Sequence, residues 1–103
     1  MPSRYLRVSE VIEQLHVSHE FLRALDAEDL IHLKASSEGD LVISAEDVER
    51  VRLAFLLTGE LDVNLPGVEV IMHMREEMLG MQRQFSEILD SLVEELRRQL
   101  HRP

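Results

Sequence analysis

The sequence has 103 residues, contains no cysteine, and carries eleven basic and twenty acidic side chains, which give a net charge of −9. This length fits one domain, or a compact head with an extended helix, and the lack of cysteine excludes disulfides, thiol nucleophiles and thiolate metal ligands. Because the sequence has neither a signal-peptide pattern nor an apolar stretch of the ~18 residues that span a membrane, we expect a cytoplasmic protein.

The negative charge is concentrated in the N-terminal part of the chain. Residues 1–64 carry six basic and thirteen acidic side chains, a net charge of −7, whereas residues 65–103 have a net charge of −2. We predict a head over residues 1–64 and a C-terminal dimerisation helix over residues 65–103. A head of this size is marginally stable alone, so packing against the long helix or pairing of two chains would supply the missing burial.

Two short amphipathic helices are predicted between residues 5 and 30. Apolar residues recur there at spacings of three and four, and Ser9 is placed to cap the first helix. Residues 16–18 interrupt the pattern, and Ser18 is positioned to cap a second helix in which Phe21 belongs to the buried stripe. Two amphipathic helices separated by a three-residue turn are typical of a helix-turn-helix.

A β-hairpin, or wing, is predicted to follow. Residues 31–35 alternate between apolar and polar side chains, residues 36–40 are rich in turn formers, and residues 41–43 favour a strand. The third helix should begin at Ala45, because Ser44 and Asp47 match a capping box, in which each side chain accepts a hydrogen bond from the other residue's backbone N–H. Its apolar residues, Phe55 among them, end near Gly59.

The C-terminal part predicts one long helix that begins beside Pro66, a residue well suited to a first helical turn. Apolar residues recur every seven positions, and from the middle of the helix onward others follow four residues later, which is a coiled-coil pattern. Gly80 would permit a bend or a close approach of a second helix. The residues predicted to form the dimer interface are Ile71, Met78, Phe85, Leu89, Leu92 and Leu96.

These segments resemble a known family. The stretch Tyr5-Leu6-Arg7-Val8-Ser9-Glu10-Val11, the wing, and the joint Leu61-Asp62-Val63-Asn64-Leu65-Pro66-Gly67-Val68-Glu69-Val70-Ile71 are similar to the MerR-like winged-helix superfamily. Within it, the short length, the acidic head and the terminal helix resemble the CbpM-type chaperone modulators. The resemblance implies a mainly α fold, namely a winged helix-turn-helix with a small β-hairpin wing and a long C-terminal helix of coiled-coil type.

The resemblance also implies a function. CbpM-type modulators bind the J-domain of a DnaJ-like (CbpA-type) co-chaperone and inhibit its stimulation of Hsp70. MerR-type DNA binders generally carry basic and aromatic side chains in the second helix and near the end of the wing. Here these places read Leu22-Arg23-Ala24-Leu25 and Leu41-Val42-Ile43, so both elements are absent. A MerR-type DNA-binding transcription regulator is the alternative, and a structural homodimer that pairs with another regulator is a third.

The candidate partner-binding residues are mostly acidic. Residues 18–29 have a net charge of −3, which opposes contact with the phosphates on which DNA affinity largely depends. These side chains form either a solvated helix face or, in the interpretation that we favour, a docking surface for a basic J-domain. The predicted partner-binding residues are Glu20, Arg23, Asp26, Glu28, Asp29, Glu46, Asp47 and Glu49.

No enzymatic activity, cofactor or metal site is expected. The sequence has no nucleophile paired with a base and no glycine loop of the kind that holds phosphates. His16 and His19 are three residues apart, but no third metal ligand accompanies them. The sequence therefore indicates a binding protein without a membrane partner, whose partners are a co-chaperone and a second copy of the chain.

Overall fold

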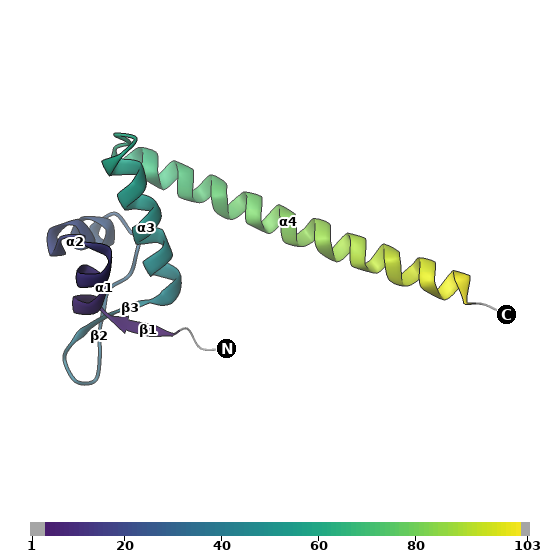
Figure 1. The fold of residues 1–103 in the computed structure, drawn as a ribbon, viewed down its shortest axis with the longest axis horizontal. Coiled ribbons are helices and arrows are strands. Elements are labelled where there is room, and N and C mark those ends of the chain that lie inside the picture. Colours follow the sequence, from purple (N-terminus) through teal and green to yellow (C-terminus); the bar gives the residue numbers. More distant parts are fainter. Residues whose placement is uncertain (1–3, 102–103) are drawn as a thin grey trace. The chain divides into compact units, whose positions relative to one another are not determined.

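The computed structural model describes residues 4–101 and divides the chain into two compact units between Val70 and Ile71 (Figure 1). The predicted ranges 1–64 and 65–103 also include residues 1–3 and 102–103, which lie outside the described part. The assignment of dimerisation to the C-terminal range stays a prediction. Across residues 4–101, no helix is both long and apolar enough to cross a membrane.

The first unit is the winged helix-turn-helix that the sequence predicted. Its elements in chain order are β1 (Tyr5–Arg7), α1 (Val8–Leu15), α2 (His19–Ala27), β2 (Lys34–Ala35), β3 (Leu41–Ser44) and α3 (Ala45–Gly59). The second unit consists of most of α4 (Leu65–Leu100), a long helix whose first turns belong to the first unit. The described chain is thus mainly helical, with one small sheet.

The helix-turn-helix is confirmed by its local hydrogen bonds. His16 ends α1 in the left-handed conformation, with φ of 57°, and turns the chain toward α2. The Ser18 Oγ accepts a hydrogen bond of 3.0 Å from the backbone N–H of Phe21, which makes Ser18 the predicted cap of α2. The apolar faces of the head pack into a core whose fully buried side chains include Val11, Leu22, Leu25, Ile31, Ile43, Val51 and Val68.

The predicted start of the first helix is wrong, because residues 5–7 form a strand. β1 pairs antiparallel with β3, and Leu6 lies opposite Ile43. The chain passes directly from this strand into α1, so Arg7 occupies the N-cap position and no side chain caps the helix. Ser9 lies within the first turn of α1 instead. Pairing with a distant strand therefore overrides the local capping signal.

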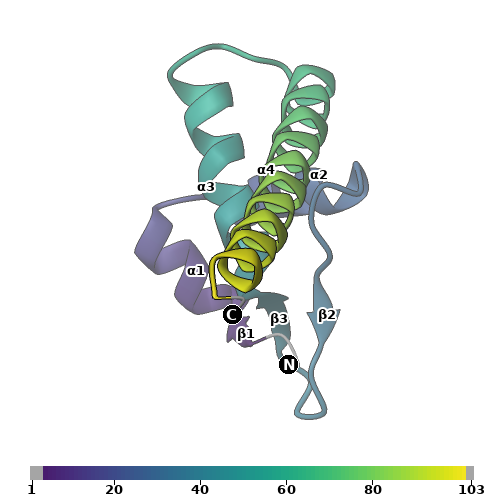
Figure 2. The same cartoon turned by 90° about the vertical axis from the view of Figure 1, so that its right-hand side faces the viewer.

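The wing is present, and its first strand is shorter than predicted. The sheet has the order β1-β3-β2, with β2 antiparallel to β3 (Figure 2). Residues 36–40 form the turn, in which Gly39 has φ of +90° and donates a hydrogen bond of 2.9 Å to the Ser36 carbonyl. Of the predicted strand 31–35, only Lys34 and Ala35 pair with β3. Ile31 is buried in the core instead.

The two later helices begin as predicted, within one residue. The Ser44 Oγ accepts a hydrogen bond of 3.1 Å from Asp47 N–H and so caps α3. At α4, the Asn64 Oδ1 accepts one of 2.9 Å from Gly67 N–H. A Cβ atom at Gly67 would lie 2.7 Å from Val63 Cγ1 and 3.1 Å from Asn64 Oδ1. The absence of a side chain at Gly67 therefore permits this cap.

Candidate partner-binding surfaces

The predicted partner-binding residues all lie at the surface of the head, on two helices and the turn after the first of them. Glu20, Arg23 and Asp26 belong to α2, and Glu28 and Asp29 follow its end. Glu46, Asp47 and Glu49 lie in the first turns of α3. Asp26 and Asp47 are half-buried, and the other six residues are exposed.

The two half-buried carboxylates hold the loop that joins α2 to the wing. The Asp47 Oδ2 accepts a hydrogen bond of 2.8 Å from His32 N–H, and the Asp26 Oδ1 accepts one of 3.2 Å from Leu33 N–H. The Arg50 Nε donates a hydrogen bond of 2.6 Å to the Leu30 carbonyl. Backbone groups that the wing does not pair are satisfied in this way. Asp26 and Asp47 therefore have a structural role.

This arrangement corrects one detail of the predicted capping box. Ser44 caps α3 as expected, but the Asp47 carboxylate bonds to His32 N–H in the loop, whereas the capping box would direct it to Ser44 N–H. The arrangement also brings the acids of α2 and α3 together, because both helices send a carboxylate to residues 32–33. The exposed acids next to Asp26 and Asp47 in the sequence thus flank one and the same loop.

Three basic side chains of the head contact neighbouring side chains. The Lys34 Nζ donates a hydrogen bond of 3.1 Å to the Tyr5 hydroxyl and lies 5.4 Å from the centre of the tyrosine ring. Arg7 of β1 pairs with Asp40 in the turn of the wing at 4.0 Å. On α3, Arg52 pairs with Glu49 at 3.3 Å. The remaining exposed carboxylates therefore give the surface of the head its negative charge.

An aromatic contact between α2 and α3 was not predicted from the sequence. The rings of Phe21 and Phe55 meet edge to face, with centroids 5.9 Å apart and planes at 72°. The spacing places Phe21 in the buried stripe and Phe55 two turns after buried Val48, but Phe21 is only half-buried and Phe55 is 46% exposed. The spacing of apolar residues shows which of them share one face of a helix. It does not show how much of that face is buried by neighbouring elements.

The predicted dimer residues form an apolar stripe along α4 that is open in the single chain. The exposed fractions are 63% for Met78, 62% for Phe85, 43% for Leu89, 53% for Leu92 and 49% for Leu96. Ile71 is half-buried. A contiguous apolar stripe of this kind typically marks an interaction surface. Their spacing places these residues on one face of α4, and their role in a dimer stays a prediction.

Gly80 does not interrupt α4. It follows Ile71 by nine residues, so at about 100° per residue it lies on the side of α4 opposite the apolar stripe. The helix continues through Gly80 without a break, and a Cβ atom there would meet only the Arg83 Nη2, at 3.9 Å. The glycine therefore does not interrupt the helix, and it lies away from the apolar stripe.

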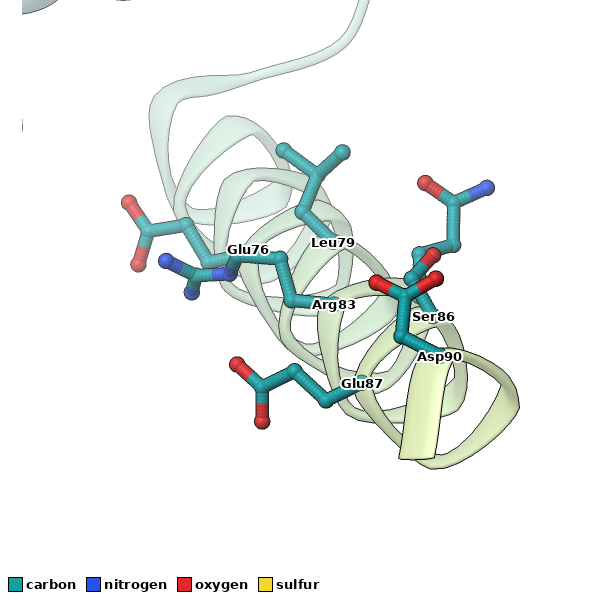
Figure 3. Close-up of a pocket in the computed structure, with 7 residues that line it drawn as sticks. Glu76, Leu79, Arg83, Ser86, Glu87 and Asp90 are labelled. Carbon is teal, nitrogen blue, oxygen red and sulfur yellow. The ribbon is translucent and has the colours of Figure 1, made fainter. Parts of the chain in front are cut away.

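A shallow hollow lies along the same helix between charged side chains (Figure 3). Its lining includes Glu76, Leu79, Arg83, Glu87 and Asp90, all of which belong to α4. Sites for small molecules are concave and bury most of the ligand, which the side chains of one exposed helix cannot do. This hollow is therefore not a candidate ligand site.

No metal centre is formed by the residues that the structure describes, since no three His, Asp or Glu side chains among 4–101 are grouped to hold an ion.

The chain matches the family described as MerR HTH family regulatory protein over residues 6–90. The match spans the winged helix-turn-helix and much of α4. The protein therefore belongs to this MerR-type helix-turn-helix family. A comparison with curated proteins gave no match.

Proposed function

We propose that the protein is a chaperone modulator that binds the J-domain of a DnaJ-like co-chaperone in the cytoplasm and inhibits its stimulation of Hsp70. The observation that carries this proposal is the charge of the helix-turn-helix. Residues 1–64 have a net charge of −7, and exposed carboxylates occupy α2, the turn after it and the start of α3. The resemblance to CbpM-type modulators supplies the identity of the partner.

A basic helix is the type of surface that such a head attracts. Complementary charge raises the rate of association and makes the affinity sensitive to salt. A modulator that covers the basic surface of a J-domain would keep Hsp70 from contacting it. Inhibition then requires only occupancy, and no catalytic group is needed.

We further propose that two copies pair through α4. The support is the open apolar stripe, which runs along a helix of 36 residues, about 54 Å at 1.5 Å per residue. Stripes of this kind are covered in coiled coils and helix bundles. A homodimer would place two acidic heads in one molecule.

The competing function is that of a MerR-type transcription regulator that binds DNA. Membership of a family described as regulatory favours it. The scarcity of basic side chains at the wing argues against DNA binding. Its one lysine, Lys34, contacts Tyr5, and Arg7 on the adjoining strand β1 is paired with Asp40. Phosphate contacts supply most of the affinity of such proteins for DNA, and they require available cations.

One experiment separates the two functions. Titration calorimetry with the purified cognate co-chaperone should show binding that weakens as salt increases, and the protein should lower the ATPase rate of Hsp70 stimulated by that co-chaperone. Hsp70 without its co-chaperone is the control and should be unaffected. If the wild-type protein neither binds the co-chaperone nor changes the stimulated rate, the chaperone-modulator function is wrong.

A further inference from the structure

We infer that the aromatic pair Phe21–Phe55 is the centre of the partner-binding surface, and that it receives an apolar side chain from a basic helix of the co-chaperone. The inference rests on the proposed chaperone-modulator function and adds to it the residues that dominate the affinity. The pair joins α2 and α3, the same two helices that carry the predicted partner-binding acids.

The acidic residues alone do not provide apolar area for binding a partner. Exposed ion pairs contribute little affinity, whereas a few aromatic side chains at the centre of an interface commonly dominate it. Phe55 is 46% exposed and Phe21 is half-buried, so a partner side chain would cover ring surface that the single chain leaves in water. Two of the predicted acids, Asp26 and Asp47, already accept bonds from the loop and have less to offer a partner.

The pair is also fixed before any partner arrives. Phe21 lies in the first turn of α2, where the Ser18 hydroxyl holds its backbone N–H at 3.0 Å. Phe55 is in the body of α3, and the edge-to-face contact restricts both rings. A surface that is already ordered loses little conformational entropy on binding, which favours affinity.

The net charge of the head favours a basic occupant. Glu20 is the residue before Phe21, and Glu28 lies in the turn directly after the end of α2. Arg52 lies one turn before Phe55, but it is paired with Glu49. Arg23, two residues after Phe21, is exposed, but residues 1–64 as a whole carry a net charge of −7. A helix with an apolar residue between lysines or arginines matches this pattern.

The test compares Phe55→Ala with Leu56→Ala in the full-length protein. Both side chains are 46% exposed on α3, and successive residues of a helix point about 100° apart, so Leu56→Ala is a matched control for loss of exposed apolar surface. In titration with the cognate co-chaperone, we expect Phe55→Ala to weaken binding at least tenfold and Leu56→Ala less than threefold. Circular dichroism and thermal unfolding check that each variant is folded. If Phe55→Ala loses helix content, Phe55→Leu decides the question and should weaken binding several-fold.

A second readout separates the ring pair from its charged border. The dependence of affinity on salt should be unchanged in Phe55→Ala, and it should become shallower in the double variant Glu20→Gln, Glu28→Gln. If the wild type and Phe55→Ala bind the co-chaperone with equal affinity, this inference is wrong, while the proposed function is still supported. A smaller sedimentation mass for Phe55→Ala also overturns the inference, because a second copy would then occupy the pair. Absence of wild-type binding refutes the proposed function itself.

Discussion

Asp26 and Asp47 accept hydrogen bonds from the backbone N–H groups of two adjacent residues, Leu33 and His32, although they lie on different helices. Together they hold the loop at the point where the chain leaves the helix-turn-helix and enters the wing. Part of the acidic character of the head therefore serves folding. The experiments on charge must separate this role from partner binding.

Replacing Asp47 with alanine should lower the free energy of unfolding by about 1 kcal/mol, because the loop loses the acceptor for His32 N–H. The neighbouring variant Glu46→Ala is the control. Glu46 is exposed, so its removal should change stability by less than about 0.5 kcal/mol. Urea unfolding followed by circular dichroism measures both, and equal stability of the two variants would contradict the structural role of Asp47.

Reversal of charge should be tested at Glu20 and Glu28 and not at Asp26 and Asp29. Asp26 holds Leu33, and Asp29 has φ of 59°, a conformation in which lysine is less favourable than aspartate. We expect Glu20→Lys, Glu28→Lys to reduce affinity for the co-chaperone and to leave the unfolding temperature within a few degrees of the wild type. Calorimetry at two salt concentrations measures the loss, and unchanged affinity would mean that these acids lie outside the interface.

Two glycines of α4 should respond to alanine in opposite directions. At Gly67, the new methyl group would displace Val63 or the cap residue Asn64 and lower stability by about 1 kcal/mol. At Gly80, where only Arg83 is near, the gain in helix propensity should raise stability by about 1 kcal/mol. Thermal unfolding compares the two variants. The opposite order would show that Gly80, and not Gly67, is closely packed.

The double variant Phe85→Glu, Leu92→Glu should sediment as a monomer, because it places charge in the middle of the apolar stripe. The matched control is Glu87→Gln, Asp90→Asn, which alters residues on another side of the same helix and should keep the dimer mass. A dimer that survives the first variant would place the interface elsewhere. A monomeric wild type would refute pairing through α4.

Duplex DNA should not be bound with useful affinity at physiological salt. The reason is the shortage of available cations on the wing and on α2, where the net charge of residues 18–29 is −3. A mobility-shift titration across a range of salt concentrations tests this expectation. Submicromolar binding with a steep salt dependence would restore the transcription-regulator alternative.

The elements that the sequence predicted correctly depend on local chemistry. Ser18, Ser44 and Asn64 each bond to a backbone N–H three residues later, and such signals can be read without knowledge of the fold. β1 was missed because three residues carry too little pattern and their partner, β3, lies more than thirty residues further along the chain. The predicted start of α1 was wrong for the same reason.

The candidate site was predictable to a similar extent. The sign of its charge follows from composition, and α2 and α3 follow from apolar spacing. The sequence does not show that Asp26 and Asp47 have backbone partners 7 and 15 residues away. Nor does it show that Phe21 and Phe55 meet at the surface, because that contact depends on how two helices cross.

The pairing of β1 with β3 also affects the order in which the head assembles. Tyr5, Leu6 and Arg7 are made before their strand partners Ser44, Ile43 and Val42. In addition, Ala45 N–H, at the start of α3, donates a hydrogen bond of 2.8 Å to the Arg4 carbonyl. During synthesis, the N-terminal segment therefore stays without its sheet partner until β3 has left the ribosome, and the sheet closes only then.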